Sequence, residues 1–143
     1  MAQIATLAPA ASRWQRMLAP AITVGSLGLA TVALHFRDPH ASGSWGMCPS
    51  AMLGISCPGC GGLRAVNDLT NLQLADAASS NLLFVLALPL ILFGIFRWVT
   101  DEWRGTIRAP RPGLLWPATT GVVVLLVVFT VLRNLPQVAW LAP

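Results

Sequence analysis

The sequence is poor in charge and contains no lysine. Only 10% of its 143 residues are charged, all nine basic residues are arginine, and 55% of the residues are hydrophobic. A water-soluble domain ordinarily has about 25% charged residues. This shortage excludes an ordinary soluble domain and is typical of a membrane protein.

Two motifs that would indicate an activity are also missing. The chain has no glycine-rich nucleotide-binding loop, and no charged residue interrupts its apolar stretches, where a transported ion or proton would bind. We therefore expect neither an autonomous pump or channel nor, more generally, an enzyme. No pattern indicates a nucleic-acid partner or a soluble small-molecule substrate.

Three apolar stretches between the arginines are long enough to cross a bilayer. They run over residues 17–36, 77–96 and 112–132, each close to the roughly 20 residues that a spanning helix needs, and we predict transmembrane helices at 17–36, 77–99 and 114–133. The first is diluted by small residues, but it is longer than the apolar core of a secretory signal, which is roughly 7–15 residues. Pro89, in the middle of the second, is expected to kink it. These stretches predict an all-α integral membrane protein with three transmembrane helices in contact with the lipid bilayer.

Arginines near the ends of these stretches predict the orientation, because cytoplasmic loops of membrane proteins are rich in Lys and Arg. A cytoplasmic N-terminus puts six arginines inside and three outside. The N-terminal tail 1–16 and the loop 100–113 are then cytoplasmic, whereas the loop 37–62 and the C-terminal tail 134–143 are external. The inside arginines are Arg13, Arg16, Arg97, Arg104, Arg108 and Arg111, and the outside ones are Arg37, Arg64 and Arg133.

All three cysteines lie in the predicted external loop, as Cys48 and as the pair in Cys57-Pro58-Gly59-Cys60. Outside the cytosol, disulfides persist. Residues 63–76 follow with helical periodicity, one polar arc and an apolar opposite side, which predicts an amphipathic helix along the membrane surface. Cys60 then lies near the N-terminus of that helix, where the helix dipole stabilises a thiolate. The polar arc contains Arg64, Asn67, Asp68 and Asn71, of which Arg64 and Asp68 are spaced to form an ion pair.

Three interpretations of the cysteines remain open. Cys57 and Cys60 have the C-x-x-C spacing of a redox dithiol. Alternatively, the three cysteines bind a soft metal ion, zinc or copper, with His40 or His35 as the fourth ligand. In the third, the cysteines are structural: Cys48 forms a disulfide with Cys57 or Cys60 and holds the loop together, or the thiols are free and packed.

The stretch CPSAMLGISCPGCGGLRAVNDLTNLQLADAASSN resembles the signature of a family of small bacterial membrane proteins known as domain of unknown function 2752. The resemblance runs from about Met47 to Phe96 and implies an integral protein of the bacterial cytoplasmic membrane, with no established activity. Two positions depart from the family pattern: Leu63 replaces its usual Thr, and Leu82 replaces a frequent Pro. The matching positions are Cys48, Pro49, Gly54, Cys57, Pro58, Cys60, Gly61 and Arg64.

A small protein of this shape is expected to be an accessory or structural subunit of a larger membrane complex, together with other membrane proteins. Gly25, Ser26 and Gly28 in the first stretch would allow close helix contact. The alternative function is metal binding or thiol redox chemistry at Cys48, Cys57 and Cys60.

Overall fold

The computed structural model describes residues 12–41, 50, 53–106 and 112–141, and the structural statements below concern these residues. Cys48 and Pro49 lie outside this set, together with the other residues of 1–11, 42–49, 51–52, 107–111 and 142–143. The regular elements among the described residues are all helices, with no strand, which confirms the all-α prediction. The elements are α1 (Arg13–Phe36), α3 (Gly62–Thr70), α4 (Leu74–Arg104), α5 (Pro112–Arg133) and the 3-10 helix η1 (Pro136–Leu141).

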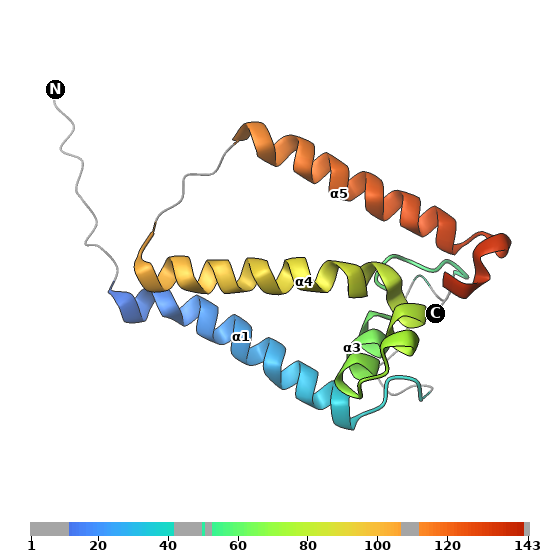
Figure 1. Ribbon diagram of the computed structural model, residues 1–143, viewed down its shortest axis with the longest axis horizontal. Helices are drawn as coiled ribbons and strands as arrows, with labels where there is room; N and C mark the ends of the chain where they lie inside the picture. Colours follow the sequence, from blue (N-terminus) through green and yellow to red (C-terminus); the bar gives the residue numbers. More distant parts are fainter. Residues whose placement is uncertain (1–11, 42–49, 51–52, 107–111, 142–143) are drawn as a thin grey trace.

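Three of these helices are long and apolar enough to cross a membrane, as predicted: α1, α4 and residues Leu115–Arg133 of α5. They alternate in direction. The start of α1 lies beside the end of α4, whereas α3, η1 and the end of α5 gather at the opposite end of the molecule (Figure 1). We call this opposite end, with residues 53–61, the loop end. The three helices indicate a membrane protein.

Local signals explain where α1 begins and how it meets α4. The Ser12 hydroxyl accepts from the Gln15 N–H and the Gln15 side chain accepts from the Ser12 N–H, a reciprocal capping box that starts the helix at Arg13. One turn later, Arg16 Nε donates to the carbonyl of Glu102 at 3.2 Å. The guanidinium of Arg13 also lies 5.0 Å from the ring centroid of Trp103. These contacts join the first turn of α1 to the last turns of α4.

The amphipathic helix is shorter than the predicted 63–76. It ends at Thr70, because Leu72 adopts a left-handed conformation (φ 63°) and the Gln73 N–H turns back to the Asp68 carbonyl at 2.8 Å. A leucine at such a position is unusual, so the helical periodicity gave no sign of the stop. Residues 74–76, predicted to belong to this helix, instead form the first turn of α4.

The non-helical backbone inside α4 is at Asn81, eight residues before the expected kink at Pro89. Asn81 is extended (φ −160°, ψ 90°), and its side-chain oxygen accepts from the Phe84 N–H at 3.0 Å. This is the geometry of an N-cap residue, so a new helical segment starts immediately after Asn81. The apolar part of α4 therefore has its own capped beginning, separate from the short turn at 74–80.

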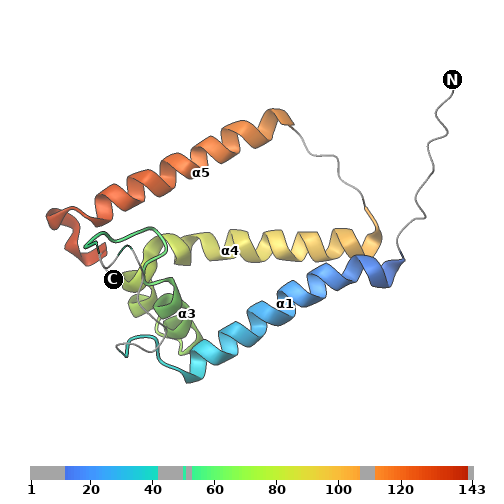
Figure 2. The ribbon, with the colours of Figure 1, turned by 180° about the vertical axis from the view of Figure 1, so that it is seen from behind.

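α5 stands apart from the other long helices along most of its length. Helix packing joins α1, α3 and α4 to one another, whereas α5 packs against η1 and diverges from α4 away from the loop end (Figure 2). Every side chain from Val122 to Val128 is at least 37% exposed. Seven consecutive residues cover all directions around a helix, so no side of this stretch is buried by the described part of the chain.

Candidate functional site

Cys57 and Cys60 face each other across a tight turn at the loop end. The Cys60 N–H donates to the Cys57 carbonyl at 3.1 Å, which closes the turn, and the two Sγ atoms lie 3.2 Å apart. That separation exceeds the S–S bond of about 2.05 Å in a disulfide. It is shorter than the about 3.8 Å between two thiolates on a tetrahedral zinc, for which each Zn–S bond is about 2.3 Å. Both side chains are partly exposed.

Asn81 fixes the shape of this turn from α4. Its side-chain amide donates to the carbonyl of Pro58 at 2.9 Å and to the carbonyl of Cys60 at 3.1 Å, while its oxygen caps the helical segment that follows. Asn81 is only 1% exposed. One buried side chain therefore connects the cysteine turn to the start of the apolar helix.

The end of α5 holds the same turn from another side. Arg133 Nη1 donates to the Cys57 carbonyl at 3.4 Å, and Nη2 donates to the Ser80 carbonyl at 2.9 Å. The next residue, Asn134, exchanges two hydrogen bonds of 2.9 Å with the backbone N–H and carbonyl of Ser56. Residues more than 70 positions apart in the sequence thus enclose the two cysteines.

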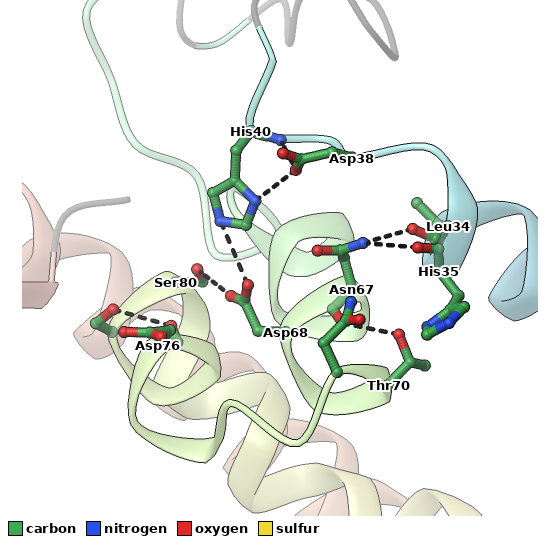
Figure 3. Close-up of polar contacts among 11 residues, drawn as sticks. Leu34, His35, Asp38, His40, Asn67, Asp68, Thr70, Asp76 and Ser80 are labelled. Carbon is green, nitrogen blue, oxygen red and sulfur yellow. Dashed lines mark hydrogen bonds and ion pairs between the residues drawn. The ribbon is translucent and has the colours of Figure 1, made fainter.

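A second polar cluster lies between α3, α4 and the segment after α1 (Figure 3). His40 Nδ1 lies 2.8 Å from one carboxylate oxygen of Asp38, and His40 Nε2 lies 3.4 Å from one of Asp68. The other oxygen of Asp68 accepts from the Ser80 hydroxyl at 2.9 Å. Hydrogen bonds from the backbone N–H and the ring of His40 lower the pKa of Asp38 below its ordinary value.

The middle of the polar arc, Asn67 and Asp68 on α3, faces the interior of the molecule. Asn67 and Asp68 are buried, and the Asn67 amide donates to the Leu34 carbonyl at 2.7 Å, which satisfies an acceptor at the end of α1 (Figure 3). The ion pair expected between Arg64 and Asp68 is not among the ion pairs of the described residues. The carboxylate of Asp68 has turned inward to Ser80 and His40, and this direction explains the difference.

The structure places the proposed metal ligands in two separate clusters. His40 contacts Asp38 and Asp68, whereas Cys57 and Cys60 contact each other. The described residues contain no group of three His, Cys, Asp or Glu side chains that could hold a metal ion. Since Cys48 lies outside these residues, the ligand set of Cys48, Cys57, Cys60 and His40 stays a prediction, as does a disulfide to Cys48.

The glycines of the motif have a clear structural role. Gly61 has φ 75° and directly precedes α3, and Gly54 has φ 70° in the turn before the cysteines. A side chain at either position would be strained, because residues with a Cβ rarely adopt these angles. Pro58 occupies the second position of the cysteine turn, where its fixed φ favours the bend.

Sequence reasoning did not identify Asn81, Arg133 or Asn134 as parts of the site. Asn81 falls inside the predicted helix 77–99, although an asparagine directly before a run of apolar residues is a recognisable N-cap signal. Arg133 and Asn134 were assigned to the end of the third stretch and to the tail. No local pattern links them to cysteines more than 70 residues earlier.

Comparison with known proteins supports the resemblance noted from the cysteine motif. Residues 48–95 match the family described as "Protein of unknown function (DUF2752)", and this segment contains the cysteine turn, α3 and Asn81. Neither the curated proteins nor the solved structures contain a match to the chain. Residues 48–95, which make up about a third of the chain, are therefore similar to the domain of unknown function 2752.

Proposed function

We propose that Cys57 and Cys60 form a thiol–disulfide exchange site on a membrane protein. The observation that carries the proposal is the 3.2 Å separation of the two Sγ atoms in a turn whose carbonyls are held by Asn81 and Arg133. A small change of the side-chain torsions would close a disulfide from this position, and both sulfurs are partly exposed to a partner.

The exchange involves a disulfide of a second protein as the oxidant. A thiolate of the pair attacks one sulfur of that disulfide, which forms a mixed disulfide and releases the other sulfur as a thiolate. The second cysteine of the pair then attacks the mixed disulfide, so that Cys57 and Cys60 become bonded and the partner leaves with two thiols. Two electrons pass to the partner, and a dithiol protein restores the pair by the reverse reaction.

The proposed location is a bacterial cytoplasmic membrane, with the N-terminus inside and the cysteines outside. Support comes from the arginine distribution and from the structure, because the starts of α1 and α5 and the end of α4 lie away from the loop end. In this orientation the pair meets an oxidising compartment, where substrate disulfides occur.

Trapping of the mixed disulfide tests the function. In a Cys48→Ser background, the protein is purified in detergent, reduced, and incubated with oxidised glutathione or a disulfide-containing peptide. We expect the intact pair to gain an internal disulfide, and Cys57→Ser or Cys60→Ser to stop at a mixed disulfide that mass spectrometry detects. A pair that stays reduced under these conditions contradicts the proposal. Bound zinc or copper that depends on both cysteines would favour the metal interpretation.

A second candidate is the role of an accessory subunit in a larger membrane complex. It is supported by α5, whose residues Val122–Val128 are exposed in every direction within the described chain, although most membrane helices pack against neighbours. A helix of a partner subunit would cover this surface. The two candidates are compatible, because a subunit can also present the thiol site.

Site-specific crosslinking distinguishes a protein neighbour from lipid. A photoreactive residue is placed at Val123 or Val127 of α5, and at Leu29 of α1 as an exposed comparison position. We expect crosslinking in native membranes to give a discrete protein adduct from at least one α5 position in excess of Leu29. Adducts with lipid alone at both α5 positions would contradict the subunit role.

A further inference from the structure

Arg133 is a buried guanidinium without an acidic partner among the described residues. It is 2% exposed, and none of the ion pairs found among the described residues involves it. Its Nε has no hydrogen-bond partner there. A buried charge without a counter-charge is strongly destabilising, so the arginine requires an explanation.

The described neighbours of Arg133 compensate only part of its buried positive charge. Two carbonyls, those of Cys57 and Ser80, accept from Nη1 and Nη2, and the Phe129 ring lies 5.5 Å from the guanidinium carbon. Carbonyls and a ring supply partial negative charge but no net charge. Asp68, the buried carboxylate among the described residues, connects to Arg133 through Ser80, whose hydroxyl donates to Asp68 and whose carbonyl accepts from Arg133.

The ionisable side chains of the turn that Arg133 contacts are the thiols of Cys57 and Cys60, and a negative charge on either would attract the guanidinium. They belong to the turn whose carbonyl Arg133 contacts, and their sulfurs lie within 3.2 Å of each other. A dithiol that loses one proton can share the remaining one between its sulfurs, which supplies a single negative charge. The charge of this form matches the single positive charge of the arginine.

We propose that Arg133 is the counter-ion of a Cys57–Cys60 thiolate, and that this pairing sets both the reactivity of the dithiol and the attachment of α5. The inference rests on the proposed thiol function and adds a residue that lies outside the family segment 48–95. When a substrate disulfide oxidises the pair, the negative charge leaves with the released thiolate. Arg133 then keeps its two carbonyl contacts but loses its counter-charge, so the end of α5 is held less firmly in the oxidised protein.

The pH dependence of alkylation tests this pairing. In a Cys48→Ser background, reduced protein in detergent is treated with iodoacetamide between about pH 5 and pH 10, and mass spectrometry follows the peptides that contain Cys57 and Cys60. An ordinary thiol reaches half of its maximal reactivity near pH 8.5. We expect one wild-type cysteine to do so at least about one pH unit lower, and Arg133→Gln to slow its alkylation near pH 6.5 by about tenfold.

Two further variants separate charge from structure. Arg133→Lys keeps the charge and should retain most of the low-pH reactivity, whereas Arg104→Gln, an exposed arginine at the other end of α4, should match the wild type. Circular dichroism and size-exclusion chromatography establish that each variant is folded. A wild-type midpoint at or above about pH 8.5 for both cysteines overturns the proposal even if Arg133→Gln does not fold. A folded Arg133→Gln with the wild-type profile overturns it as well.

The two proposals fail in different ways. A wild-type pair that alkylates at low pH but forms no disulfide with a substrate would contradict the exchange function and leave the pairing of Arg133 with a thiolate in place. A pair that exchanges disulfides, with the same pH profile in the wild type and in Arg133→Gln, would support the exchange function and contradict the role of Arg133 as counter-ion. Limited proteolysis of the segment after Arg133 measures the attachment of α5, and equal cleavage rates in reduced and oxidised protein would contradict the loosening.

Discussion

At Asn81 a single amide serves two segments of the chain. Its oxygen caps the apolar part of α4, and its nitrogen holds the carbonyls of Pro58 and Cys60. Asparagine suits both tasks because its side chain carries an acceptor and two donors. Aspartate would keep the cap but lose the donors, and serine would be too short to reach both partners from the same position.

Replacing Asn81 should reveal these two roles separately. Asn81→Ala removes the cap and leaves two carbonyls without their donor, for an expected loss of about 2–4 kcal/mol in the free energy of unfolding. Asn81→Asp should restore helix stability in part but leave the cysteine turn loose, which faster alkylation of Cys57 and Cys60 would show. Ser79→Ala, an exposed hydroxyl in the same turn, is the control. Thermal unfolding in detergent measures all three, and equal stability of Asn81→Ala and the control would contradict the assignment.

Asp38 predicts a dependence of stability on acid pH. Its pKa is lowered in the folded protein, first by the His40 N–H and then by the His40 ring. A depressed carboxyl pKa contributes stability above the unfolded value of 3.8, and this contribution is lost as the pH falls through the lower, folded value. Between about pH 5 and pH 3, wild-type protein should therefore lose slightly more thermal stability than Asp38→Asn. Identical pH dependence of the two proteins would contradict this.

At the scale of whole helices, the boundary between α3 and α4 depends on one strained residue. Leu72 has φ 63° and is 86% exposed, so its side chain contributes little packing within the described chain and its backbone is in a region that suits glycine. The turn it forms lets Asp68 and Ser80, on consecutive helices, meet in a buried hydrogen bond.

Glycine at position 72 should consequently stabilise the protein. We expect Leu72→Gly to raise the free energy of unfolding by about 1 kcal/mol, since it removes the left-handed strain. Leu74→Gly is the matched control, because Leu74 is also exposed, at 66%, but lies in the helical first turn of α4. That control should lose up to about 1 kcal/mol. Chemical unfolding in detergent distinguishes the two, and a loss of stability in Leu72→Gly would contradict the prediction.

The long helices could be predicted from the sequence, whereas most contacts between the helices could not. Apolar length and arginine spacing located α1, α4 and α5, because the requirement for crossing a bilayer depends on local composition. The start of α3 followed from its periodicity, but its end did not, since Leu72 carries no local stop signal. A kink at Pro89 could be predicted from the sequence, whereas the non-helical backbone at Asn81 could not. The contacts of Arg133 with Cys57 and Ser80 depend on tertiary folding, which periodicity does not report.

For the molecule as a whole, the orientation in the membrane is open to a direct labelling test. An impermeant maleimide applied to intact cells, after mild reduction, should modify Cys57 and Cys60 if the loop end is external. A Thr106→Cys variant of a cysteine-free protein should react only after the membrane is permeabilised, because Thr106 directly follows α4 at the opposite end. The reverse pattern would place the thiols in the cytosol and contradict the proposed location.

The contacts around the cysteine turn at the loop end join residues from both halves of the chain. The segment 48–95 alone therefore lacks part of them. Residues 48–95 contain the cysteines and Asn81, but Arg133, the last residue of α5, and Asn134, which follows it, lie beyond that segment. A chimaera that carries only the matched segment on another protein would contain the cysteine turn but not Arg133. A transferred segment that keeps the contact between the cysteine turn and Arg133 must therefore also include the last turn of α5.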